Sequence, residues 1–137
     1  MPALTLLRGR SEQPLTAIDV RRTVAKRFED QGFAVHDFSR SGYVRVHDVD
    51  GLDLTIVARG DEVHGPKVVL RIRDALGEIA QRMKAGPNAY ALALPDSPGW
   101  RDEIGNVRAF LALAKIAVFW VAQVDGVWSI EDERFEP

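Results

Sequence analysis

Apolar residues recur three or four positions apart in three parts of the chain, and this spacing predicts three helices. The three parts are residues 16–30, 67–84 and 97–114. In each of them the apolar side chains share one face, which is typical of a helix that packs against a core. The start signals are Thr16 with Asp19 for the first helix and Ser97 followed by Pro98 for the third.

Short runs of β-branched, aromatic and other apolar residues predict six strands. The runs are residues 33–39, 43–49, 52–59, 89–94, 116–121 and 127–130. Two pairs of strands are joined by the turn signals Asp50-Gly51 and Asp125-Gly126, which are typical of two-residue hairpin loops. Counting outward from Asp50-Gly51, we expect Val44 opposite Val57 and Asp48 opposite Asp53.

The order of these elements predicts an α/β fold in which helices cover the faces of a mixed sheet. The chain has 137 residues, of which 46% are hydrophobic and 28% charged, as expected for one globular domain. We therefore expect a single domain over residues 1–137, with its core at about 16–130. Residues 1–12 are expected to form a flexible arm, and residues 131–137 a flexible tail.

Charge and cysteine content narrow the function classes. The formal net charge of -2 gives no overall attraction to nucleic acid or to an anionic membrane, so a nucleic-acid site must be a local patch. The absence of cysteine excludes disulfides, thiolate metal sites and thiol nucleophiles. No apolar run has the length of a signal-peptide core or a transmembrane helix, so we expect a cytoplasmic protein without membrane contact.

The element order, together with the segment ALALPDSPGWRDEIGNVRAFLALAKIAVFWV, resembles the restriction-endonuclease-like superfamily of PD-(D/E)XK nucleases. The resemblance spans roughly residues 16–130. It implies an αβββαβ core, followed here by a further helix and a β-hairpin. It also implies a Mg²⁺ site made by an aspartate on the second strand and an acid-x-lysine on the third. A glutamine or glutamate on the following helix often completes that site.

The third predicted strand departs from this motif. It ends in Val57-Ala58-Arg59-Gly60, where such a nuclease would have acid-x-Lys-Gly. Valine cannot bind Mg²⁺, and an arginine is a poor proton acceptor because its pKa is very high. None of the four lysines has an acid two residues before it. The resemblance therefore implies the fold with a degenerate catalytic motif.

Several acids and bases remain as candidates for a relocated site. Glu78 corresponds to the helix position that contributes to the nuclease site, and a second acid must then come from elsewhere in the chain, because Mg²⁺ is held by converging oxygen ligands. The candidate metal ligands are Asp53, Glu62 and Glu78, with Asp48 as an alternative. The candidate catalytic residues are Arg59, Lys67 and Glu78, and the candidate nucleic-acid-binding residues are Arg45, Arg59, Lys67 and Arg71. Each acid also has a purely structural interpretation, as part of a solvated turn or of a charged helix face.

Three hypotheses of function follow. The first is a catalytically degenerate nuclease-fold protein, without a cofactor, that acts as a nucleic-acid-associated or protein-interaction module. The second is an active Mg²⁺-dependent nuclease with relocated residues. The third is a self-associating scaffold that pairs through a sheet edge formed by the segment VWSI, because an unpaired edge strand is a template for another chain.

Overall fold

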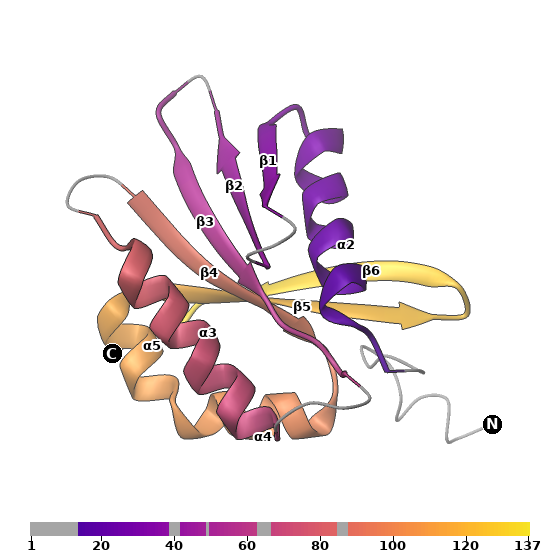
Figure 1. Cartoon of the computed structure of the whole chain (residues 1–137), viewed down its shortest axis with the longest axis vertical. Helices are drawn as coiled ribbons and strands as arrows, with labels where there is room; N and C mark the ends of the chain where they lie inside the picture. The colour runs from indigo at the N-terminus through magenta and orange to yellow at the C-terminus, as the bar shows by residue number, and fades with distance from the viewer. Residues whose placement is uncertain (1–13, 39–41, 49, 63–66, 85–87) are drawn as a thin grey trace.

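Six strands form one mixed, twisted sheet with helices on both faces, within the part of the chain that the structure describes (Figure 1). The structure is a computed structural model that describes residues 14–38, 42–48, 50–62, 67–84 and 88–137. The strands are β1 (Ala34–Phe38), β2 (Tyr43–His47), β3 (Asp53–Ala58), β4 (Asn88–Pro95), β5 (Ile116–Val124) and β6 (Val127–Glu133). The helices are α2 (Ala17–Asp30), α3 (Val68–Arg82), α4 (Pro98–Asn106) and α5 (Arg108–Ala114). The predicted mixed sheet with helices on its faces is confirmed.

The strands lie in the sheet in the same order as in the sequence, from β1 to β6. β1, β2 and β3 are antiparallel neighbours, whereas β3, β4 and β5 run parallel to one another. The helix α3 connects β3 to β4, and α4 with α5 connects β4 to β5, because parallel strands need a crossover connection. β6 runs antiparallel to β5 and forms one edge of the sheet.

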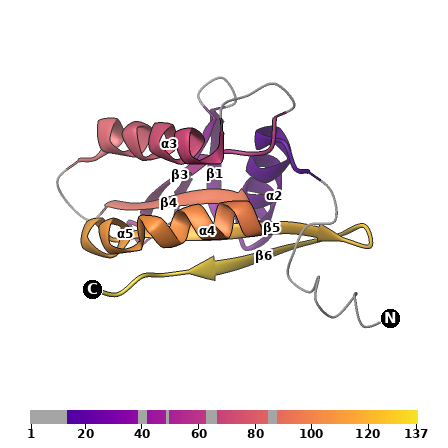
Figure 2. The same cartoon turned by 90° about the horizontal axis from the view of Figure 1, so that it is seen from below.

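The buried apolar side chains form two clusters on the two faces of the sheet, and Figures 1 and 2 show how the helices are arranged around the sheet. One cluster, which we call the α2-side core, packs α2 against the strands. The other, the α3-side core, packs α3, α4 and α5 against the opposite face. Alternate residues of β3 enter different clusters, with Ile56 in the α2-side core and Val57 in the α3-side core. Such strands are apolar on both faces because helices cover both.

The first helix begins and ends as its sequence predicts. Thr16 and Asp19 form a capping box, in which each side chain accepts a hydrogen bond from the other residue's backbone N–H. Gly32 follows the helix with φ of +91°, a conformation that favours glycine. No described helix has the length and apolar character needed to cross a membrane.

The predicted register of the β2–β3 hairpin is wrong by one residue. Tyr43 lies opposite Val57, and His47 lies opposite Asp53. The reason is the loop, in which Asp48 Oδ1 accepts hydrogen bonds from the backbone N–H groups of Asp50 and Leu52, at 2.9 and 2.8 Å. The backbone N–H of Asp48 also lies 3.4 Å from the carbonyl oxygen of Leu52, so the loop contains three residues where two were expected.

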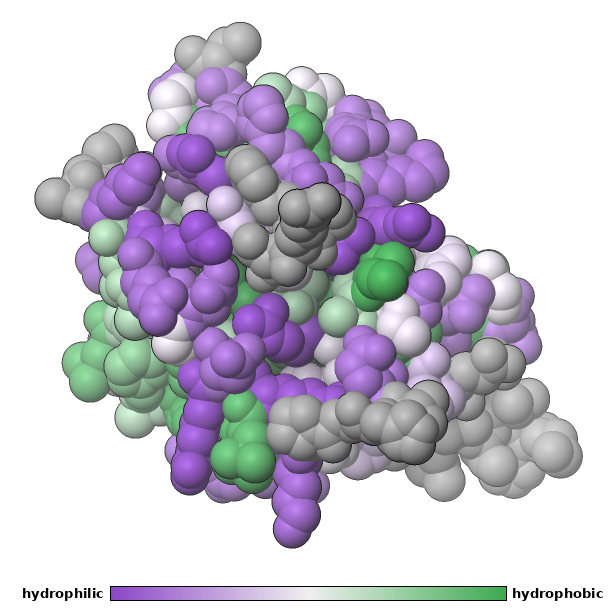
Figure 3. Space-filling model, viewed as in Figure 1, coloured by the Kyte–Doolittle hydropathy of each residue, from purple (hydrophilic) through white to green (hydrophobic). Residues whose placement is uncertain are grey.

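The predicted third helix is divided in two. The backbone at Val107 has φ of -113° and ψ of 13°, which ends α4 and precedes α5. Gly105 and Asn106 come immediately before this break, and both have low helix propensity. Both helices are therefore short. The side chains of Phe110 and Leu113 on α5 are half or more exposed. Figure 3 shows apolar surface at the lower left, the side on which Figure 1 places α5.

The expected C-terminal tail belongs to the fold as far as Phe135. β6 continues to Glu133, and the side chain of Phe135 is buried in the α3-side core. The Arg108 guanidinium lies 5.0 Å from the centre of the Phe135 ring. Phe135 is the aromatic residue of the mostly charged segment EDERFEP, and its burial makes it the anchor of this end of the chain. The expected arm at 1–12 lies outside the described residues.

Candidate functional site

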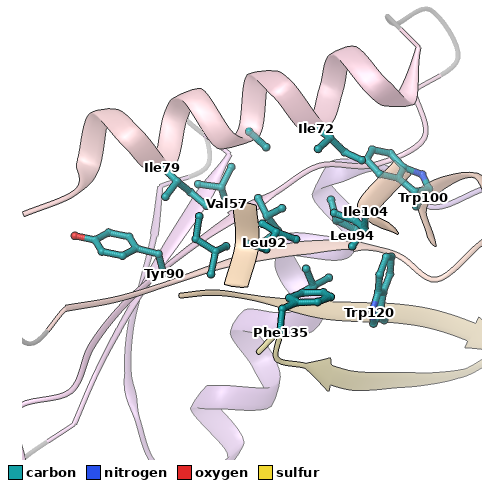
Figure 4. Packing of buried hydrophobic residues seen from close by; sticks show 14 of the residues in the cluster. Val57, Ile72, Ile79, Tyr90, Leu92, Leu94, Trp100, Ile104, Trp120 and Phe135 are labelled. Atoms are coloured by element: carbon teal, nitrogen blue, oxygen red, sulfur yellow. The ribbon is translucent and has the colours of Figure 1, made fainter. Parts of the chain in front are cut away.

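The position that the nuclease motif assigns to an acid is a core position. Val57 is fully buried, with Tyr43 opposite on β2 and Leu92 beside it on β4. Figure 4 shows Val57 close to Ile79 of α3 and to Leu92. A carboxylate placed here would lose its hydration without a cationic partner, and burying such a charge is very costly.

Arg59, at the motif's lysine position, forms an ion pair with α3. Its Nη2 and Nε atoms lie 2.7 and 3.1 Å from Asp74 Oδ2, and Nη1 donates to the carbonyl oxygen of Ala58. The Arg59 side chain is only 18% exposed, whereas that of Asp74 is 71% exposed. Arg59 therefore links the end of β3 to α3.

Arg71 is buried and holds the loop that follows β3. Its guanidinium donates to the carbonyl oxygens of Gly60 and Glu62, the latter at 3.1 Å. The Glu62 carboxylate accepts from the backbone N–H of Ala17 at 2.9 Å, so it stabilises the start of α2. Lys67 lies exposed at the start of α3. These three candidates gather at the C-terminal end of β3, where Arg71 and Glu62 already have structural partners.

Asp61 joins three segments at the same end of the sheet. Its carboxylate accepts hydrogen bonds from the Leu15 backbone N–H at 3.3 Å and from the Trp100 indole Nε1 at 2.9 Å. Its own backbone N–H donates to the Leu15 carbonyl oxygen at 2.6 Å. The sequence shows only an acid after a strand, so these bonds to distant residues had no local signal.

Asp53 and Arg45 meet at the opposite end of β3. Arg45 Nη2 lies 2.8 Å from Asp53 Oδ2, and His47 Nδ1 lies 3.9 Å from Asp53 Oδ1. Arg45 and Asp53 border a hollow of about 290 Å³ beneath the end of α3, which we call the β3 hollow. Its lining residues are Tyr43, Arg45, Asp53, Thr55, Gln81, Arg82, Lys84, Asn88 and Tyr90.

Glu78 pairs with Arg82, one turn further along α3. The carboxylate oxygen Oε1 of Glu78 lies 2.7 Å from Nη2 and 3.0 Å from Nε of Arg82. The Arg82 guanidinium stacks over the Tyr43 ring at 3.7 Å, a favourable cation–π geometry. Arg82 is therefore the residue that connects Glu78 to the β3 hollow, and its i,i+4 spacing from Glu78 is the signal that could have found it.

The candidate metal ligands fall into separate groups. Asp53 is the first residue of β3, and Ala58 at the strand's end is about 17 Å away at 3.3 Å per residue. Glu62 lies past that end beside α2, and Asp48 is engaged in its own turn. Among the described residues, no three His, Cys, Asp or Glu side chains come together in a way that could hold a metal ion.

A buried ion pair at the C-terminal end of β4 was not predicted from the sequence. Asp96 is nearly inaccessible to solvent, and both of its oxygens accept from Arg101, at 2.8 and 3.0 Å. The hydrogen bond to Asp96 raises the pKa of Arg101 above its usual value. The Arg101 guanidinium also lies 4.2 Å from the Trp120 ring centre, so this pair secures α4 on β5.

No family model, curated protein or solved structure was found to match this chain.

Proposed function

We propose that this protein is a catalytically inactive domain with a nuclease-like αβββαβ core, and that it works as a protein-interaction module. The burial of Val57 supports the inactive interpretation, because it puts an apolar core residue where the nuclease motif needs a Mg²⁺ ligand. The ion pair of Arg59 with Asp74 supports it further, because the residue at the position of the motif's lysine links β3 to α3 instead of facing a metal site.

The observation that carries the interaction role is the open edge at β6. This strand is last in the sheet order, and it exposes Val127 at 66% and Trp128 at 39%. An exposed edge with apolar side chains is suited to strand addition, in which a partner's backbone extends the sheet. Exposed aromatic residues are also frequent anchors of protein interfaces.

The charge pattern of β6 indicates which kind of partner strand fits this edge. Its first half is apolar, whereas Glu131 and Asp132 in the second half are exposed acids. Symmetric antiparallel pairing of two full-length β6 strands sets Trp128 opposite Asp132, which is a poor cross-strand match. An extended segment that alternates apolar and basic residues complements β6 better than a second copy does.

The test uses two ten-residue peptides, one alternating lysine with valine and the other alternating glutamate with valine. We expect the lysine peptide to shift the backbone amide NMR signals of β6 and to slow their hydrogen exchange, while the glutamate peptide has little effect. Trp128→Lys reduces this binding because it removes the apolar anchor and adds a like charge, whereas Phe110→Lys on α5 is a control. Shifts confined to other surfaces, or equal binding of both peptides, would refute the role of β6.

Light scattering of the peptide-free protein over a wide concentration range tests the alternative partner. A monomer mass agrees with the proposal. A dimer whose mass falls to that of the monomer in Trp128→Lys identifies a second copy as the occupant of the edge.

A second candidate function is nucleic-acid association at the β3 hollow. Three basic residues, Arg45, Arg82 and Lys84, line it beside one acid, Asp53. Fluorescence anisotropy with single-stranded and duplex oligonucleotides, at increasing salt, tests this alternative. Salt-sensitive binding that falls in Lys84→Gln but not in Arg73→Gln supports it, because Arg73 is an exposed cation outside the hollow.

Cleavage of plasmid, single-stranded DNA or RNA in Mg²⁺ or Mn²⁺ is the direct test of inactivity. We expect no cleavage. Turnover that is lost with EDTA and in Glu78→Ala would instead establish a relocated nuclease site.

A further inference from the structure

A second, larger cavity lies on the sheet face that α2 covers only in part. It has a volume of about 510 Å³, within the range of small-molecule sites, and none of the sequence-predicted residues for metal, catalysis or nucleic acid lines it. We call it the α2-side cavity. It lies beside the C-terminal part of α2, over β4, β5 and β6.

The cavity exists because the strands beneath it carry small side chains. Ala89 and Ala91 of β4 and Ala117 of β5 line it, where larger residues would fill the space. Phe28 and Phe119 form part of its apolar wall, and their rings contact each other edge to face at 5.7 Å between centroids. The interior is therefore suited to an apolar group.

The rim of the cavity is basic. Arg27, Lys115 and Arg134 line it together with a single acid, Asp132. Among the described residues, none of these three basic side chains forms an ion pair or a side-chain hydrogen bond. Three arginines at the other end of the sheet behave differently, since Arg59, Arg71 and Arg101 all have partners within the protein. Arg27 also lies in the last turn of α2, where it offsets the negative end of the helix dipole.

Lys115 occupies a conformation that is unfavourable for lysine. It ends α5 with φ of 58° and ψ of 44°, in the left-handed region where glycine is usual. The backbone N–H of Lys115 caps α5 by donating to carbonyl oxygens of the last turn, and a side chain held in such a conformation motivates a hypothesis of function. Here the strained position carries one of the three cations, so a glycine would relieve the strain and lose the charge.

We infer that the α2-side cavity binds a small amphipathic anion, with an apolar body inside the cavity and a carboxylate or phosphate group at the basic rim. The size and apolar lining of the cavity indicate the apolar body of the ligand. The three basic side chains without ion-pair partners indicate that its head group is an anion. This inference goes beyond the proposed interaction role and does not depend on it, because strand addition uses the backbone groups at the outer edge of β6, whereas the cavity lies over the sheet face to which Ile130 and Asp132 of β6 contribute side chains.

The binding test compares four probes that share a ten-carbon chain: decanoate, decyl phosphate, decanol and decylamine. Calorimetry and amide NMR follow binding to the intact chain. We expect at least one of the two anions to bind and to shift the signals of Ala89, Ala91 and Ala117. We expect decanol to bind about tenfold more weakly than that anion, because it keeps the apolar body but loses the charge-assisted hydrogen bonds.

The relative affinities of decanoate and decyl phosphate distinguish a carboxylate ligand from a phosphate ligand. Equal binding of decanol and both anions, stronger binding of decylamine, or no binding of any probe would overturn the proposal.

Variants separate binding from folding. Ala117→Leu fills the cavity, and we expect it to abolish anion binding. Lys115→Gly is expected to raise the melting temperature and to weaken anion binding about tenfold, a combination that a purely structural role does not give. Arg73→Gln, on the opposite side of the sheet, is the matched loss of one cation and should leave affinity unchanged. Unchanged affinity in Lys115→Gly, or an equal loss in Arg73→Gln, would contradict the assignment of the rim.

Discussion

At the scale of single residues, Gly60 shows how close contact between two backbone segments fixes a residue type. A Cβ atom at position 60 would lie 2.3 Å from the nitrogen of Ala17 and 2.4 Å from the carbonyl carbon of Thr16. These are backbone atoms at the start of α2, so they cannot turn aside as a flexible side chain can. Glycine at position 60 is therefore required by packing.

We expect Gly60→Ala to lower the free energy of unfolding by about 3 kcal/mol, because the loop and α2 must separate. Urea unfolding followed by circular dichroism measures the change. Gly77→Ala is the matched control, since Gly77 lies in the interior of α3 and its Cβ would meet nothing within 4 Å. That change should raise stability by about 1 kcal/mol. Equal stability of the two variants would contradict the close contact at Gly60.

Two arginines that share a candidate binding role in the sequence should differ sharply in their effect on stability. Arg71→Met leaves the buried carbonyl of Gly60 without its donor and should cost about 2 kcal/mol. Arg59→Met removes a pair whose acid, Asp74, is mostly exposed, and should cost about 1 kcal/mol or less. Parallel urea titrations compare the two variants. A larger loss of stability in Arg59→Met than in Arg71→Met would contradict the structural role of Arg71.

At the scale of elements, the side chain of Asp48 determines how β2 pairs with β3. Its Oδ1 atom accepts from two backbone N–H groups of the loop, and Gly51 adopts φ of +94° within it. A shift of one residue turns every side chain of a strand to the other face. The loop hydrogen bonds therefore fix both the hairpin and the meeting of Arg45 with Asp53.

Two predicted helix caps provide a matched test at the same scale. Thr16→Ala removes the side chain that accepts from the Asp19 N–H, and should lower the free energy of unfolding by about 1 kcal/mol. Ser97→Ala should change it by less than about 0.5 kcal/mol, because the Ser97 side chain makes no capping hydrogen bond. Thermal and urea unfolding of both variants check the difference. A large loss of stability in Ser97→Ala, with none in Thr16→Ala, would show that Ser97 and not Thr16 caps its helix.

At the scale of the whole molecule, the sequence predicted the parts that depend on residues close together in the chain. The apolar stripes of α2 and α3 and the Asp125-Gly126 turn are of this kind, and the structure has all three. Asp125 and Gly126 both adopt positive φ, as a two-residue hairpin turn requires. The third helix was only partly predicted, because its apolar spacing continues across the break at Val107.

The candidate site could not be assembled from the sequence, because nothing local shows which acids converge. Asp53 and Glu62 are nine positions apart, yet one lies at each end of β3. Arg71 has the spacing of a charged helix face, but its side chain is buried because it donates hydrogen bonds to the carbonyl oxygens of Gly60 and Glu62. The α2-side cavity likewise arises from alanines on two strands that meet only in the folded sheet.

Hydrogen exchange should report the layered structure of the whole molecule. We expect the amides of β3, β4 and β5 to exchange by far the most slowly, because both faces of these strands are buried. The edge strands β1 and β6 should exchange orders of magnitude faster. Amide NMR after transfer to deuterated water measures the rates. Uniform protection across all six strands would indicate that the edges are covered.

The strand order also affects how the protein can fold while it is being synthesised. Each of the strands β2 to β6 pairs in space with the strand made just before it, and no later strand has to insert between two earlier ones. During synthesis on the ribosome the sheet can therefore grow at one edge, strand by strand. The antiparallel pairings β1–β2, β2–β3 and β5–β6 close short stretches of chain, which costs little loop entropy and favours rapid folding, whereas the parallel pairings β3–β4 and β4–β5 close the longer helical crossovers.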